Sequence, residues 1–160
     1  MQFHHVCLVV SDIKKALNLY CDVLGFSPYI DTVIPDGDGP QALFSQSTLD
    51  DIFHVHGAKS HMVMLVSPEG AKIELQQPSI PKVQAVEKEQ LRYGYVGISE
   101  LAFRVQGIDA WFEKIRSSGF ETQTNYVWAV ASGRLRSFLF YDFDGNMIQL
   151  CEEFTVSDGT

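Results

Sequence analysis

The chain has 160 residues, of which 46% are hydrophobic, and a formal net charge of -8. This composition predicts a packed core of one domain or two small modules, with disorder expected only at the tail, residues 155–160. The negative charge argues against nucleic-acid or anionic-membrane partners, because phosphate groups would repel the chain. The three cysteines have no CxxC spacing, and neither a basic leader nor a membrane-length apolar run is visible. We therefore expect a soluble, cytoplasmic protein with reduced thiols.

The first half begins with a strand and a helix. Residues 5–10 alternate in character, as in a strand, and Ser11 and Asp12 then form a capping start. Apolar residues follow with the 3.6-residue period of an amphipathic helix. They are Ile13, Ala16, Leu17, Tyr20, Val23 and Leu24. Gly25 is placed to end this helix in a left-handed conformation.

The remainder of the first half reads as strands and loops. Residues 31–57 form a long segment of mixed character, in which the prolines and glycines of 35–40 indicate a loop. The turn 67–70 joins two strands as a hairpin. Residues 78–97 form the predicted linker, in which the charged stretch 86–92 is a candidate short helix.

The second half shows the same order of elements. A predicted strand, residues 100–105, precedes a helix that ends at Gly119, and the turn 142–145 joins two further strands. The helix is indicated by apolar residues at helical spacing. They are Ile108, Trp111, Phe112 and Ile115.

The two halves align as an internal repeat. Residues 61–76 match 136–151 without a gap. Residues 5–10 match 100–105, and the Gly-Phe pairs that end the two helices, 25–26 and 119–120, match with one residue of slack. The repeat predicts an α+β fold of two tandem βαβββ modules, whose curled mixed sheets surround a shared concave site. The expected organisation is one integrated domain with four parts. These are a first module at 1–77, a linker at 78–97, a second module at 98–154 and a tail at 155–160.

Strand parity selects four polar residues. In each predicted strand the apolar residues form the face that the helix covers, and one polar residue points the other way. The four are His5, Glu74, Glu100 and Gln149. The repeat makes His5 equivalent to Glu100 and Glu74 equivalent to Gln149. A lone polar residue in such a strand more often faces water. The joint placement of the four is what favours one polar site shared by both halves.

Five segments resemble the vicinal-oxygen-chelate superfamily, which includes glyoxalase I, extradiol dioxygenases, fosfomycin-resistance enzymes and bleomycin-binding proteins. They are residues 5–12, 20–26, 73–75, 101–105 and 142–150. The resemblance covers residues 3–154. It is specific for the fold and weak for the reaction, because members of the superfamily catalyse different chemistry.

The resemblance implies that His5, Glu74, Glu100 and Gln149 are metal ligands. Glu100 stands where the family usually has a histidine, and Gln149 stands where it usually has a glutamate. One imidazole with three oxygen ligands suits Zn(II), Ni(II), Mn(II), Co(II), Mg(II) or Fe(II). The sequence does not choose among these ions, and the two departures leave a metal-free site open.

Three functions follow as alternatives. The first is a metal-dependent lyase or isomerase of glyoxalase I-like type, acting on a small oxygenated substrate by chelation of two adjacent oxygens and proton transfer. Glu100 and Glu74 are its candidate catalytic residues. The second is a metal-free member that binds a small molecule or drug, as in resistance proteins. The third is a dioxygenase, which is disfavoured because only one histidine occupies a ligand position. The resemblance also suggests a homodimer.

Four further residues are candidates for a substrate pocket. His54 and His56 would share one side of a strand, although the polar face of a loop is the more common explanation. Arg136 is suited to bind a carboxylate or phosphate, and an exposed arginine is equally expected there. Trp128 belongs to an aromatic group that packs in the core or lines a pocket.

Overall fold

The computed structural model describes residues 1–154, except for the side chain of Ala131. The tail predicted at 155–160 lies outside the described residues. The chain divides into two compact units, Met1–Ala85 and Val86–Thr160, called unit 1 and unit 2 below. No helix in the described part of the chain is long and apolar enough to cross a membrane.

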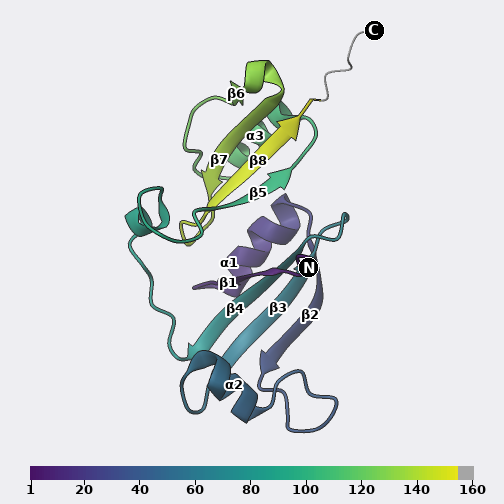
Figure 1. The fold of residues 1–160 in the computed structure, drawn as a ribbon, viewed down its shortest axis with the longest axis vertical. Helices are drawn as coiled ribbons and strands as arrows, with labels where there is room; N and C mark the ends of the chain where they lie inside the picture. The colour runs from purple at the N-terminus through teal and green to yellow at the C-terminus, as the bar shows by residue number, and fades with distance from the viewer. Residues whose placement is uncertain (155–160) are drawn as a thin grey trace. The chain divides into compact units, whose positions relative to one another are not determined.

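Unit 1 is a four-stranded mixed sheet with two helical segments (Figure 1). The strands lie in the order β1-β4-β3-β2, with β1 parallel to β4 and the other neighbours antiparallel. The elements in chain order are β1 (Val6–Val9), α1 (Ile13–Leu17), the π-helix η1 (Asn18–Val23), β2 (Ser27–Ile34), α2 (Gln46–Phe53), β3 (Lys59–Val66) and β4 (Lys72–Ile80).

Unit 2 repeats this topology in the order β5-β8-β7-β6, again with one parallel pair, β5 and β8 (Figure 1). Its elements are the 3-10 helix η2 (Lys88–Leu91), β5 (Glu100–Arg104), α3 (Ile108–Ser117), β6 (Trp128–Val130), the turn η3 (Ala131–Gly133), β7 (Leu135–Tyr141) and β8 (Met147–Glu153). The predicted α+β fold of two tandem modules is therefore confirmed.

The helix after β1 starts as predicted and then widens. Asp12 caps α1 by accepting hydrogen bonds from the backbone N–H groups of Lys14 and Lys15. From Asn18 the helix becomes a π-helix, in which the Leu24 N–H donates to the Leu19 carbonyl at 2.9 Å. The sequence predicted one continuous α-helix. The wider turn lets Leu19 be buried together with its neighbour Tyr20, although helical spacing from Ile13 did not select Leu19.

The strand registers of the two units confirm the gapless part of the repeat. Met64 pairs with Glu74 in unit 1, and their repeat equivalents Leu139 and Gln149 pair in unit 2. The turns agree as well, because Gly70 and Gly145 each donate a backbone hydrogen bond to the residue three positions earlier. The two glycines have φ of 89° and 91°, a conformation that favours residues without a side chain.

In each sheet, one face is covered by the helix that follows the first strand of the unit. In unit 2, Phe112 of α3 packs edge-on against Phe138 of β7 at a centroid distance of 5.1 Å. In unit 1, Gln77 accepts a hydrogen bond from the first N–H of α1, which places this helix on the face that also contains the buried Ile73 and Leu75. The opposite face of this sheet is covered in part by α2. Its buried cluster contains Ile34, Leu49, Ala58 and Met62.

Candidate functional site

The strands of unit 1 bring two of the predicted ligands together. Cys7 on β1 pairs with Glu74 on the adjacent parallel strand β4. His5 directly precedes β1, and its contact with Glu74 places its side chain on the same face of the sheet as Cys7, away from α1. His5 Nε2 lies 3.3 Å from Glu74 Oε2, and both side chains are partly accessible, at 31% and 14%.

The Glu74 carboxylate accepts a hydrogen bond from a buried amide on the same strand. Gln76 Nε2 donates to Glu74 Oε1 at 2.7 Å, and Ser60 Oγ donates to Gln76 Oε1. Gln76 and Ser60 are 5% and 1% exposed. These bonds occupy one carboxylate oxygen and direct the other toward His5. Our sequence reasoning missed Gln76, although its position two residues after Glu74 places it on the same face of the strand.

His5 is also engaged through its second nitrogen. His5 Nδ1 lies 2.6 Å from Nδ1 of His4. When Nδ1 of a histidine carries the hydrogen, the lone pair of Nε2 is available to a ligand, and such outer partners fix the ring orientation in metal sites. The contact with His4 engages Nδ1, so Nε2 is the nitrogen of His5 that faces Glu74.

Cys7 lies beside this pair and donates from Sγ to Glu74 Oε1 at 3.6 Å. Loss of solvent around the thiol and, after it, the charge and hydrogen bond of Glu74 raise the pKa of Cys7 to about 12. The thiol is therefore neutral at physiological pH and is not an activated nucleophile. Like Cys21 and Cys151, it is a free cysteine.

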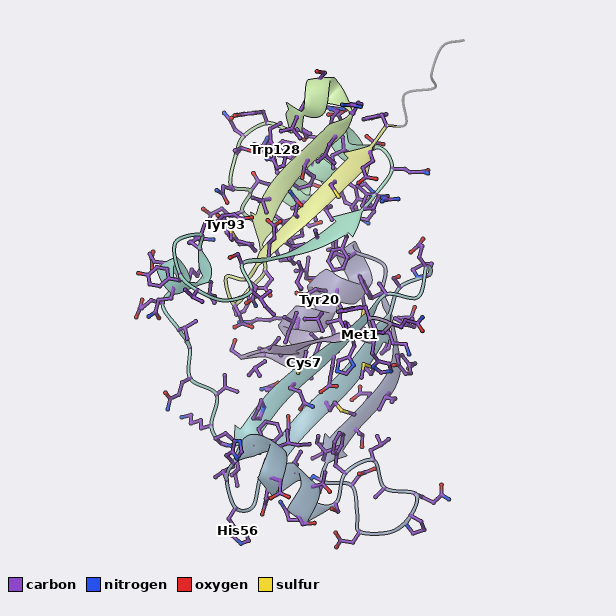
Figure 2. The ribbon with its side chains drawn as sticks, in the orientation of Figure 1. Met1, Cys7, Tyr20, His56, Tyr93 and Trp128 are labelled. Atoms are coloured by element: carbon purple, nitrogen blue, oxygen red, sulfur yellow. The ribbon has the colours of Figure 1, made fainter. Side chains whose placement is uncertain are left out.

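In unit 2 the equivalent pair is supported by a different segment. Gln149 on β8 pairs with Ala102 on β5, and Glu100 lies two residues before Ala102 on the same face. Tyr93, from the segment that precedes β5, donates from its hydroxyl to Glu100 Oε2 at 2.5 Å. The hydrogen bond to Glu100 raises the pKa of Tyr93 above its usual value. Figure 2 shows Tyr93 on this segment, where our sequence analysis expected only a linker.

The donor atoms fit a divalent cation in part. Two ligand atoms about 2.1 Å from an ion and at right angles to each other lie about 3 Å apart, close to the separation of His5 Nε2 and Glu74 Oε2. Glu100 and Gln149 add two oxygen donors on the equivalent face of unit 2. Within neither unit do the described residues form a metal-holding group of three or more His, Cys, Asp or Glu side chains. Each unit by itself offers two of the four predicted donors.

The two histidines predicted for the substrate pocket lie around the end of α2. His54 is the C-cap residue of this helix, in a left-handed conformation with φ of 51°. His56 Nδ1 lies 3.0 Å from Asp50 Oδ2, and its exposed ring points away from the sheet (Figure 2). Neither residue belongs to a strand. Their contacts therefore support the end of α2, and the argument from strand parity does not apply to them.

Arg136 and Trp128 lie on opposite faces of the sheet in unit 2. Both terminal nitrogens of Arg136 bond the carboxylate of Asp109 in the first turn of α3, at 2.7 and 2.6 Å, which places Arg136 on the helix-covered face. Trp128 pairs with Ser137, which pairs with Cys151, so it shares the helix-free face with Gln149. Of these two candidates, the structure places only Trp128 on the face of the predicted ligands.

Comparison with known proteins identifies the family. The family model of the glyoxalase/bleomycin resistance protein/dioxygenase superfamily matches residues 4–140. The chain belongs to this superfamily. The resemblance noted in the sequence is thereby confirmed.

Solved structures of the superfamily share the fold at low identity. A glyoxalase family protein from Bacillus cereus has a TM-score of 0.79 at 17% identity, covering 97% of this chain and 95% of that chain. The fosfomycin resistance protein FosX from Listeria monocytogenes, in a mutant form solved with Mn(II) and 1S,2S-dihydroxypropylphosphonic acid, has a TM-score of 0.58 at 17% identity. The match covers 93% of this chain and 87% of FosX.

One curated relative is a longer enzyme. The chain is 25% identical over 119 residues to 4-hydroxyphenylpyruvate dioxygenase of Xenopus tropicalis. The match covers 74% of this chain but only 25% of the length of that relative.

Proposed function

We propose that this superfamily member is a metal-dependent lyase or isomerase of glyoxalase I-like type, acting on a small substrate with two adjacent oxygens. The observation that carries the proposal is the pair His5 and Glu74, whose Nε2 and Oε2 atoms lie 3.3 Å apart, with His5 directly before β1 and Glu74 on the neighbouring strand β4. Both side chains are fixed by outer partners, as metal ligands usually are. Glu100 and Gln149 occupy the equivalent positions in unit 2 and are the proposed further ligands.

A bound divalent ion would supply a Lewis acid for the two substrate oxygens. The residues of the chain would supply orientation and proton transfer. Glu100 is our candidate for the base that removes a proton next to a carbonyl group, with Glu74 as the alternative. The hydroxyl of Tyr93 holds one oxygen of Glu100, so the other oxygen is the atom that would bind the metal and, when released from it, would accept the proton.

The FosX comparison motivates the choice of a substrate with two adjacent oxygens. The compound named with Mn(II) in that structure is a dihydroxypropylphosphonic acid, which bears two adjacent hydroxyl groups. At 17% identity the likeness shows the fold alone, so neither Mn(II) nor this compound is transferred to the present protein.

Metal analysis of protein purified without chelator tests the proposal directly. We expect close to one equivalent of a divalent metal, or its uptake on titration, and loss of this uptake in Glu74→Ala. Glu69→Ala, which removes an exposed carboxylate in the turn after β3, is the matched control. Less than about a tenth of an equivalent, with none taken up on titration, would overturn the proposal.

A dioxygenase is the second candidate, and the match to 4-hydroxyphenylpyruvate dioxygenase is the observation that favours it. Against it, only one histidine occupies the four proposed ligand positions, whereas iron(II) oxygenases use two histidines and one carboxylate. Oxygen consumption with 4-hydroxyphenylpyruvate or a catechol in the presence of Fe(II) would establish this activity. Absence of consumption with a metal-loaded protein would remove it.

Metal-free binding of a small molecule or drug is the third candidate. It is favoured by the absence, among the described residues of either unit, of a complete metal-holding group of His, Cys, Asp and Glu side chains. Under this alternative, ligand binding should survive both chelation and the substitution Gln149→Ala. Loss of binding on chelation would exclude it.

A further inference from the structure

Arg92 lies over the helix-free face of the sheet in unit 2. Its guanidinium carbon is 3.5 Å from the centroid of the Tyr141 ring. Tyr141 pairs with Met147, and Met147 pairs with Glu100, so the three side chains form a row across one face. Arg92 therefore covers the same face that presents Glu100 and Gln149.

One nitrogen of this guanidinium lacks a hydrogen-bond partner among the described residues. Arg92 Nη1 is buried, and no hydrogen-bond acceptor reaches it among the residues that the structure describes. Two other arginines of unit 2 have carboxylate partners, Arg104 with Glu153 and Arg136 with Asp109. Glu100, which shares the face, instead accepts a hydrogen bond from Tyr93.

An unpartnered guanidinium nitrogen calls for an explanation. Buried polar groups in native proteins are nearly always hydrogen-bonded, so each exception needs an explanation, and a bound ion that is absent from the structure is one such explanation. Arginine stays charged in proteins, so it cannot relieve the cost of burial by losing a proton. The partner that removes this cost most effectively is an anion with oxygen atoms, because the planar fork of arginine matches such groups.

The segment that carries Arg92 is ordered by its own contacts. Glu87 and Gln90 form a reciprocal capping box at the start of η2, and the Arg92 N–H donates to the Glu89 carbonyl at 3.2 Å. Lys88 and Leu91 lie so close to Gly145 that a side chain at that glycine would meet them. The aromatic surface under Arg92 is also fixed, since the Tyr141 hydroxyl donates to Gln123 at 2.8 Å. A ligand would therefore not bear the cost of ordering this arginine.

We propose that Arg92 binds the carboxylate or phosphonate group of a small organic acid on this face of unit 2. The inference deepens the proposed function and rests on it, since it names small acids as the substrate class of that site. Anion binding by Arg92 can nevertheless be measured without metal, so the two proposals can fail separately.

The test is a titration of the metal-free full chain, followed by NMR at constant ionic strength. Propionate and methylphosphonate are the anionic probes and distinguish the two sources of the oxyanion, and propionamide is the uncharged control. We compare the wild type with Arg92→Gln, Arg92→Lys and the matched control Arg116→Gln. Arg116 also lies over an aromatic ring, that of Phe112 at 5.4 Å, but on α3.

We expect the wild type and Arg116→Gln to bind at least one of the two anions, and neither to bind propionamide. Arg92→Gln should bind the anion about tenfold more weakly or worse, and Arg92→Lys should retain part of the affinity because it keeps the charge. If the wild type binds neither anion, or if Arg92→Gln binds as tightly as the wild type, the proposal is wrong.

Metal uptake by Arg92→Gln at the level of the wild type would show that the other proposed site is intact. If Arg92→Gln fails to fold, the comparison of the wild type with Arg92→Lys and propionamide still decides the case: equal affinity for propionate and propionamide would overturn the proposal.

Discussion

The two units share one strand register but support their polar faces in different ways. In unit 1 the support comes from the sheet itself, because Gln76 on β4 and Ser60 on β3 hold the Glu74 carboxylate. By the repeat, the equivalents of Gln76 and Ser60 in unit 2 are Cys151 and Leu135, which offer no amide and no hydroxyl. The polar partner of Glu100 is Tyr93, from outside the sheet.

On the helix-covered faces, by contrast, the two units make equivalent contacts. Gln77 of β4 accepts a hydrogen bond from the first N–H of α1, and its repeat equivalent Glu152 accepts from Gly107 and Ile108 at the start of α3. The buried face that anchors each helix thus retains equivalent contacts, whereas the open face has diverged. Divergence on the open face is expected where a fold is retained while the residues of a site on it change.

Among the substitutions that test this difference between the units, Glu74→Ala should cause the largest loss of metal affinity. Glu74→Ala removes the carboxylate that faces His5, and we expect metal affinity to fall by about 100-fold or more. Gln149→Ala, at the equivalent position of unit 2, should cost less because an amide oxygen is a weaker ligand than a carboxylate. Calorimetric titration with Zn(II) and Mn(II) measures both. Equal losses in the two variants would show that the two units contribute alike.

Gln76 should have the next largest effect. Gln76→Leu removes the amide that orients Glu74 and should weaken metal binding by about 10- to 100-fold, the usual cost of losing an outer partner of a ligand. The matched change in unit 2, Cys151→Ser, should leave metal affinity close to that of the wild type. If Gln76→Leu binds metal normally while remaining folded by circular dichroism, the buried amide has no role in the site.

The sequence predicted much of this architecture. Strand parity placed His5 with Glu74 and Glu100 with Gln149 on equivalent faces, and the registers around Glu74 and Gln149 agree with that placement. Side-chain alternation is a local property of strands, so it can be read from sequence. The partners Tyr93 and Arg92 could not be found in this way, because a connecting segment has no periodicity that fixes where its side chains point.

The stability of the two helix anchors offers a third test. Glu152→Ala removes charge-assisted hydrogen bonds to two backbone N–H groups of α3 and should lower the free energy of unfolding by about 1.5 kcal/mol. Gln77→Ala removes one neutral hydrogen bond in unit 1 and should cost about 1 kcal/mol. Urea denaturation of both variants gives the comparison. A larger loss for Gln77→Ala would contradict this ranking.

The smallest expected effect is the pH dependence of the Asp109–Arg136 pair. The hydrogen bonds from Arg136 lower the pKa of Asp109 below 3.8, so the folded state favours the ionised carboxylate. Stability from this pair should be complete well above pH 3.8 and should be lost as the pH falls through the lowered pKa. The pair is exposed, so its contribution is small and screened by salt. Asp109→Asn should therefore unfold at a slightly lower temperature than the wild type at pH 7, and the difference should shrink under strongly acidic conditions. Thermal unfolding across this pH range measures it, and a difference that grows on acidification would contradict the assignment of the pair.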